Sequence, residues 1–239
     1  MTGAQAVVAA LERAGVETIF GYPGGAIMPL YDALYEHRVR HVLVRHEAAA
    51  AFAASGYART SGRAGVCCAT SGPGATNLVT GLLDAMMDSV PLVAITGQVR
   101  TELMGTDGFQ EADVCAITQP VTKRNFLVSD ASRIGETIAE AFALAQHGRP
   151  GPVLVDIPND VLKARLDDGT FGTARESRAS GHAGPRASDD TLRDAVARIR
   201  RARRPVAIVG GGVRGGAVDL YRLFVAMLGL PHTATINAL

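Results

Sequence analysis

Tryptophan is absent from this sequence, and phenylalanine and tyrosine together account for only 5% of its 239 residues. An excess of charge of either sign is also missing, because 24 lysine and arginine residues nearly balance 23 aspartate and glutamate residues. Proteins that bind nucleic acid commonly present a basic face and stack bases on aromatic rings. We therefore expect no nucleic-acid partner and no attraction to an anionic membrane surface.

Cysteine is scarce as well, with only Cys67, Cys68 and Cys115. An odd number, with two adjacent in an apolar run, matches neither a disulfide framework nor a metal-ligand spacing, so we predict buried thiols in a reducing compartment. The start of the sequence lacks a basic segment followed by an apolar run, and no apolar run reaches membrane-spanning length. We predict a cytoplasmic protein without a membrane segment. The six histidines are scattered, and we predict no metal site in this chain.

Short apolar runs alternate with helical patterns along most of the chain. We predict strands at 18–20, 41–44, 65–69, 91–96, 125–128 and 152–157, and helices at 4–14, 27–35, 47–60, 75–87 and 132–146. The strands are continuous apolar runs rather than alternating ones, which is typical of a mostly parallel sheet covered on both faces. The predicted fold class is therefore a doubly wound α/β domain over residues 1–166.

Four polar or glycine-rich segments follow directly on predicted strands. They are the loop at Tyr22, Glu47, the loop at 71–74 and Gln98. In a parallel sheet they share the carboxyl edge, where ligands bind in such folds. One alternative is that Glu47 is an ordinary first-turn residue, which the helix macrodipole favours by roughly 0.3–1 kcal/mol. The glycine-rich loops likewise have an alternative as simple tight turns, but their convergence on one edge favours a ligand site around Glu47.

The composition changes after residue 166. Residues 167–188 are rich in Gly, Ser, Ala, Arg and Pro and predict a linker, and residues 189–239 predict the start of a second, incomplete α/β unit. In that unit Gly210, Gly212 and Gly215 follow a predicted strand in the dinucleotide-binding spacing. The acid expected at the end of the next strand is missing, which disfavours a nicotinamide dinucleotide and leaves a phosphate or flavin contact or a tight turn. We expect the elements that complete this unit to come either from the remainder of a longer chain or from another polypeptide.

A series of motifs stands in order along residues 1–163. They are GYPGGA at 21–26, RHE at 45–47, GYAR at 56–59, TSGPGATN at 70–77, TGQV at 96–99, GTD at 105–107, FQEAD at 109–113 and GRPGP at 148–152. With these motifs the chain resembles the large, catalytic subunits of acetolactate synthase, also called acetohydroxyacid synthase, a family of thiamine-diphosphate enzymes. The resemblance continues more loosely into the second unit.

The resemblance implies that residues 1–166 form a domain that holds the aminopyrimidine ring of thiamine diphosphate. A glutamate at the position of Glu47 would hydrogen-bond ring nitrogen N1′ and favour the tautomer that removes a proton from the thiazolium ring. The enzyme would decarboxylate a 2-oxo acid such as pyruvate and join the product to a second 2-oxo acid. By motif match, the pyrimidine pocket would be lined by Tyr22, Pro23, Gly24, Glu47, Thr70, Pro73, Asn77 and Gln110.

Further roles follow from the same resemblance. Gly25, Ala26 and Phe109 would border the reacting centre, and Arg149, Gly210, Gly211 and Gly212 would contact a flavin (FAD). The alternatives are that Arg149 forms only a salt bridge and that Phe109 belongs to the core. The family's Mg²⁺ and diphosphate site lies in a C-terminal domain whose signature this chain lacks. We therefore expect inactivity without that domain, and a homo-oligomer, a separate subunit carrying that domain, or both.

The chain also departs from the family's pattern. Asn159 stands where a lysine is common near the substrate channel, Arg100 replaces a common proline and Gly108 a common alanine. Alternative functions are another thiamine-diphosphate enzyme, such as a sulfoacetaldehyde acetyltransferase or a 2-oxo acid decarboxylase, or a non-catalytic subunit.

Overall fold

The computed structural model describes residues 1–166 and 186–238. The chain divides into two compact units, Met1–His182 and Ala183–Leu239. Most of the predicted linker, 167–188, lies outside the described residues.

The first unit is built on a six-stranded sheet. Its strands are β1 (Thr18–Gly21), β2 (Arg40–Leu43), β3 (Gly65–Ala69), β4 (Leu92–Gln98), β5 (Arg124–Leu127) and β6 (Pro152–Pro158). The strand order is β2-β1-β3-β4-β6-β5, and every neighbouring pair is parallel. The central strands β3, β4 and β6 are buried along their whole length, which explains their continuous apolar sequences. The predicted α/β fold class is confirmed.

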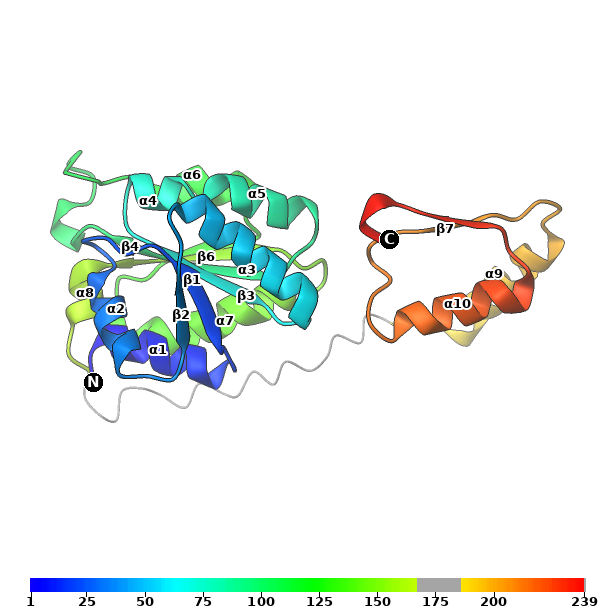
Figure 1. The fold of residues 1–239 in the computed structure, drawn as a ribbon, viewed down its shortest axis with the longest axis horizontal. Helices are drawn as coiled ribbons and strands as arrows, with labels where there is room; N and C mark the ends of the chain where they lie inside the picture. The colour runs from blue at the N-terminus through cyan, green and yellow to red at the C-terminus, as the bar shows by residue number, and fades with distance from the viewer. Residues whose placement is uncertain (167–185, 239) are drawn as a thin grey trace. The chain divides into compact units, whose positions relative to one another are not determined.

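Helices cover both faces of this sheet (Figure 1). One face carries α1 (Gly3–Arg13), α2 (Met28–Tyr35), α7 (Ile134–Gln146) and α8 (Asn159–Lys163); the other carries α3 (Glu47–Ser61), α4 (Pro73–Thr76), α5 (Val79–Met87) and α6 (Val114–Thr118). When the next strand in the chain lies nearer to β5 in the sheet, the connecting helix lies on the second face. When the next strand lies nearer to β2, the connecting helix lies on the first face. Right-handed crossovers require this division.

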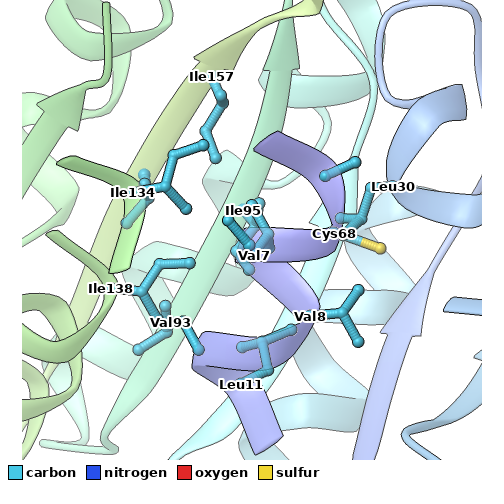
Figure 2. Packing of buried hydrophobic residues seen from close by; sticks show 14 of the residues in the cluster. Val7, Val8, Leu11, Leu30, Cys68, Val93, Ile95, Ile134, Ile138 and Ile157 are labelled. Carbon is cyan, nitrogen blue, oxygen red and sulfur yellow. The ribbon is translucent and has the colours of Figure 1, made fainter. Parts of the chain in front are cut away.

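The main core lies between α1, α7 and the sheet. Val7, Val8 and Leu11 of α1 are fully buried. Figure 2 shows Val7 beside Ile95 of β4, and Ile138 of α7 belongs to the same cluster of buried side chains. Burial of side chains of this size contributes roughly 1.5–3 kcal/mol each. This face therefore anchors the sheet whose edge carries the site.

The two ends of the first unit lie together. Leu166 donates its backbone N–H to the carbonyl of Met1 at 2.8 Å, and Gly3 donates to Ala164 at 2.9 Å. A β-carbon added at Gly3 would stand 2.2 Å from the carbonyl oxygen of Val161 in α8, so α1 and α8 touch through backbone. In the described part of the first unit, residues 1–3 are thus hydrogen-bonded to residues 164–166.

The strand order reverses its direction twice. The chain leaves β1 for β2 on one side and then returns past β1 to β3, so the helices that follow β1 and β3 lie on opposite faces of the sheet. A second reversal separates the loops after β4 and β6. In parallel sheets such points open a crevice at the carboxyl edge. Glu47, which follows β2, lies next to the first reversal. The second reversal, between β4 and β6, neighbours the first in the sheet.

The second unit consists of α9 (Asp189–Arg201), β7 (Ala207–Val209), α10 (Ala217–Leu228) and β8 (His232–Ala234), with β7 and β8 paired in parallel. Several of its described apolar side chains are exposed, among them Leu192, Ile208, Leu220 and Met227. That additional polypeptide completes this unit stays a prediction. In the part of the chain that the structure describes, no helix combines the length and apolarity needed to cross a membrane.

Candidate active site

The four predicted segments do share one edge of the sheet. Tyr22 follows the end of β1, Glu47 lies four residues after the last residue of β2, Ser71 lies two residues after β3, and Gln98 is the last residue of β4. Because all these strands are parallel, their carboxyl ends coincide. The edge arrangement predicted from the sequence is confirmed.

Glu47 is a buried carboxylate at the start of α3. His46 caps the helix by accepting the amide of Ala48 at its Nδ1, 3.1 Å away, and Glu47 is only 8% exposed. Its Oε2 accepts a hydrogen bond from Asn77 Nδ2 at 3.0 Å. Oε1 receives no hydrogen bond from any described residue. One oxygen is therefore fixed, and the other is open to a ligand.

Small residues bring Asn77 within reach of Glu47. A β-carbon added at Gly81 in α5 would stand 2.4 Å from the β-carbon of Ala51, so α3 and α5 approach closely. The predicted single helix at 75–87 is instead two helices, α4 and α5, which are separated at Asn77 and Leu78. The side chain of Asn77, at this break, is the one that binds Glu47.

Thr70 is the centre of the glycine-lined part of the site. β-Carbons added at Gly24 and Gly74 would lie 2.5 and 2.7 Å from its Cγ2, and its Oγ1 accepts the amide of Ala26 at 3.2 Å. The same added atom at Gly74 would lie 3.3 Å from Glu47 Oε1. Any larger residue at Gly74 would thus fill the space next to the open carboxylate oxygen.

The loop that carries Gln110 rests on the loop after β3. A β-carbon added at Gly72 would stand 2.6 Å from the carbonyl oxygen of Gln110, and Gly72 has φ +54°. Gln110 itself has φ +57°, which is uncommon for a residue other than glycine and is often found at functional sites. Gln110 thus packs against the residue that precedes Pro73 and α4, and the ligand role of Gln110 and Pro73 stays a prediction.

Glu111 organises that loop from within. Its carboxylate accepts the backbone amides of Gly105, of Thr106 at 3.1 Å and of Gly108 at 3.1 Å. These hydrogen bonds, the one from Gly105 foremost, lower the pKa of Glu111. The charged form of Glu111 therefore holds residues 105–108 in place beside Gln110.

A second buried carboxylate, Asp156 on β6, lies beneath the edge. It accepts hydrogen bonds from Thr96 Oγ1 at 2.7 Å and from Gln98 Nε2 at 2.9 Å. Gln98 Nε2 also donates to the carbonyl of Ala112 at 2.9 Å, so the side chain of Gln98 points into this cluster. Burial raises the pKa of Asp156 to about 6. Sequence reasoning missed this cluster, whose only signal is a lone acid inside an apolar strand.

Comparison with known proteins shows which proteins this chain is similar to. Residues 1–117 match the family described as thiamine pyrophosphate enzyme, N-terminal TPP binding domain. The chain is 53% identical over 241 residues to an acetolactate synthase large subunit of Mycobacterium tuberculosis, and 52% identical over 244 residues to that of Corynebacterium glutamicum. It is 51% identical over 240 residues to the isozyme 2 large subunit of Escherichia coli.

These alignments cover 100% of this chain but only 38–43% of the relatives' length. The chain carries, in residues 1–117, the N-terminal domain of the thiamine pyrophosphate enzymes. Within this family it corresponds to the N-terminal part of acetolactate synthase large subunits, which confirms the resemblance found in the motifs.

The remaining residues that the family resemblance assigns to this edge are accessible. Tyr22 is 39% exposed and Phe109 is 88% exposed, so the alternative that Phe109 belongs to the core is wrong. Pro23 is exposed as well. A β-carbon added at Gly25 would meet no heavy atom within 4 Å. Their exposure leaves these groups accessible to a ligand at this edge.

Arg149 lies elsewhere. It belongs to the loop between α7 and β6, at the amino ends of the strands, on the edge opposite Glu47. Its Nη2 donates to the carbonyls of Met86 and Met87 at 2.9 and 3.0 Å, and its Nε donates to Ser89 Oγ at 2.8 Å. The guanidinium thus caps the end of α5. Its flavin contact stays a prediction.

The predicted flavin residues Gly210, Gly211 and Gly212 follow β7 in the second unit. A β-carbon added at Gly211 would stand 2.9 Å from the carbonyl oxygen of Asn237, so this turn needs a residue without a side chain. The close approach accounts for one glycine of the three, and the ligand role of the turn stays a prediction. Among the described residues, no group of three or more His, Cys, Asp or Glu is placed to hold a metal ion.

Proposed function

We propose that residues 1–166 hold the aminopyrimidine ring of thiamine diphosphate in an enzyme of the acetolactate synthase type. This enzyme would decarboxylate a 2-oxo acid such as pyruvate and ligate the two-carbon product to a second 2-oxo acid. The observation that carries the proposal is the carboxylate of Glu47, which is buried, fixed at one oxygen by Asn77 and open at the other.

The residues present fit the ring. Glu47 Oε1 lies 3.3 Å from the position that a β-carbon at Gly74 would take, and Gly24 and Gly74 let their backbones pack directly against the methyl group of Thr70. When bound, thiamine diphosphate supplies the electron sink that decarboxylation of a 2-oxo acid requires. Glu47 would hold a proton against ring nitrogen N1′, and Asn77 would keep its carboxylate from rotating away. The other assigned residues, Tyr22, Pro23, Gly25, Ala26, Pro73, Phe109 and Gln110, would bound the ring and the reacting centre.

The proposal includes partners. Mg²⁺ and the diphosphate would be bound by a domain outside this chain, supplied by the rest of the protein or by a separate subunit. The open side of the Glu47 site would be covered by a second chain in an oligomer. FAD would contact Gly210, Gly211, Gly212 and Arg149. We place the enzyme in the cytoplasm, where reducing conditions keep the buried Cys67 and Cys68 as thiols.

The experiment is the replacement Glu47→Gln in the complete enzyme, that is, this chain together with its diphosphate-binding domain. Acetolactate formation is measured with pyruvate, Mg²⁺ and thiamine diphosphate. Glutamine keeps the shape but cannot exchange a proton with the ring, so we expect kcat to fall by about 10²–10⁴-fold. The melting temperature should stay unchanged. Glu17→Gln, which alters an exposed glutamate paired with Arg63, is the matched control and should retain full activity.

An unchanged kcat in Glu47→Gln would refute the assigned role. The product distinguishes the reaction types, since a simple decarboxylase would release acetaldehyde instead of acetolactate. A wild-type assembly that binds the cofactor and forms neither product would favour a non-catalytic subunit.

A further inference from the structure

The loop that leaves β1 crosses the ends of its neighbours. A β-carbon added at Gly97, near the end of β4, would stand 2.8 Å from both the carbonyl carbon of Ala26 and the amide nitrogen of Ile27. In the sheet, β3 lies between β1 and β4. The Gly25–Ala26 turn is therefore carried two strands away from the strand that precedes it.

In this turn, both the backbone amide and the backbone carbonyl of Ala26 form hydrogen bonds. The amide of Ala26 donates to Thr70 Oγ1 at 3.2 Å. The carbonyl of Ala26 accepts a hydrogen bond from Asn159 Nδ2 at 2.9 Å, and the same nitrogen lies 3.4 Å from the carbonyl oxygen of Gly25. Asn159 is the first residue of α8, which follows β6. The side chain of Asn159, which follows β6, thus holds a turn that begins after β1.

The anchor matters because the turn has little stiffness of its own. Gly24 and Gly25 are adjacent glycines, and no heavy atom lies within 4 Å of a β-carbon built on Gly25. Glycine has the largest backbone freedom of any residue, so an unanchored pair would sample many conformations. Asn159 is itself held in place, since the next residue, Asp160, accepts both the amide of Thr101 at 2.9 Å and its hydroxyl at 3.2 Å.

We propose that Asn159 is a positioning residue that fixes the Gly25–Ala26 turn through its amide N–H groups. An amide nitrogen supplies two N–H donors, and two backbone carbonyls face it here. The catalytic consequence rests on the proposed function, in which this turn borders the reacting centre. The structural part, a turn ordered by one side chain, holds independently of it.

The test replaces Asn159 by aspartate, which has the same shape but no N–H. A carboxylate is well tolerated at a helix start, so the fold should survive. Hydrogen–deuterium exchange is measured on this chain at pH 7 for peptides covering residues 22–28. Loss of one or two hydrogen bonds predicts exchange faster by about three- to tenfold. At a pH low enough to protonate the new carboxyl, its O–H can donate, and exchange should return towards that of wild type measured at the same pH.

The matched control is Asn125→Asp on β5. Asn125 also donates its amide N–H to a backbone carbonyl, that of Cys115, at 2.7 Å, away from the turn. It should leave exchange at 22–28 unchanged. Asn159→Ala, which removes the donor without adding charge, should repeat the effect of aspartate at pH 7 but show no recovery at low pH, and it replaces Asn159→Asp if that variant does not fold.

In the complete enzyme, Asn159→Asp should lower kcat more than it raises KM, because the substrate is still bound but faces a disordered turn. Unchanged exchange at 22–28 in both Asn159 variants would overturn the proposal, as would faster exchange with full kcat. If wild type itself forms no acetolactate, the proposed function fails, while the exchange data still decide whether Asn159 orders the turn.

Discussion

Two buried carboxylates near the same edge of the sheet differ in how many of their oxygens accept hydrogen bonds. Glu47 has one oxygen bound by Asn77 and the other without a partner among the described residues. Asp156 has both oxygens occupied, by Thr96 and by Gln98. Carboxylates placed in distinct environments take distinct roles. The open oxygen suits Glu47 to a ligand, and the closed pair suits Asp156 to holding β4 and β6 together.

The titration of Asp156 gives a prediction about stability. Burial raises the pKa of this carboxyl to about 6 from its ordinary value of 3.8. Its contribution to stability is therefore present below about pH 3.8 and is lost as the pH rises to about 6. The difference corresponds to roughly 3 kcal/mol. Urea unfolding between pH 4 and pH 7 should show this decline in wild type relative to Asp156→Asn, whose side chain does not titrate.

Equal pH dependence of the unfolding free energy in the two proteins would contradict that expectation. Because other groups titrate in the same range, the comparison depends on the difference between wild type and variant at each pH. A matched surface change, Asp130→Asn, should leave the dependence near pH 6 as it is in wild type, since hydrogen bonds from Ser132 lower the pKa of Asp130.

The two carboxylates also show which residues a sequence can reveal. Glu47 follows a strand and opens a helix, so its position on the edge could be predicted, and its motif neighbours Thr70 and Asn77 came with it. Asp156 lies inside an apolar run, where a single acid disturbs no periodic pattern. Gln98 was placed at the correct edge, but its side chain points inwards, because the nearby carboxylate and carbonyl offer better partners than solvent.

At the scale of elements, the loop at 105–111 behaves as one unit built around Glu111. Hydrogen bonds, first that from Gly105, lower the pKa of this glutamate. Its ordering effect is therefore present above the ordinary value of 4.5 and is lost as the pH falls through the lowered pKa. We expect Glu111→Gln to speed hydrogen exchange at residues 105–110 at pH 7, and the difference from wild type to vanish in strong acid.

The companion variant for this loop is Glu102→Gln. Glu102 is an exposed glutamate that pairs with Arg100 at 3.2 Å. Exchange at 105–110 should be the same in this variant as in wild type. If Glu111→Gln also leaves it unchanged, the loop is ordered by other contacts, and Gln110 owes its left-handed backbone to the packing on Gly72 instead.

Helices and strands differ in how well they can be predicted from the sequence. Apolar runs predicted all six strands of the sheet, and the central strands β3, β4 and β6 show no alternation because they are buried on both faces. The short helices α6 and α8 were missed, since five residues show no helical period. The break between α4 and α5 was missed for a different reason: Asn77 and Leu78 keep right-handed helical dihedral angles, so the interruption leaves no signal in the local sequence. Asn159, at the start of α8, was recognised only as a departure from the family.

At the scale of the molecule, α8 completes the first unit. Val161 and Leu162 are buried against the α1 face of the sheet. A chain ending at residue 166 should therefore unfold in one cooperative transition near the midpoint of residues 1–239. A chain ending at 158 loses these two side chains and should be less stable by roughly 3–6 kcal/mol. Thermal unfolding followed by circular dichroism compares the two, and equal midpoints would show that α8 is dispensable.

The pairing of Met1 with Leu166 has a consequence for the history of such proteins. A domain whose termini lie close together can be inserted into another polypeptide, or removed from one, without disrupting its core. Genes that rearrange by shuffling could thus move this cassette as a whole. For the same reason, a short peptide bridge from 166 back to 1, with new ends opened at an exposed loop, should yield a permuted chain that reaches the same architecture.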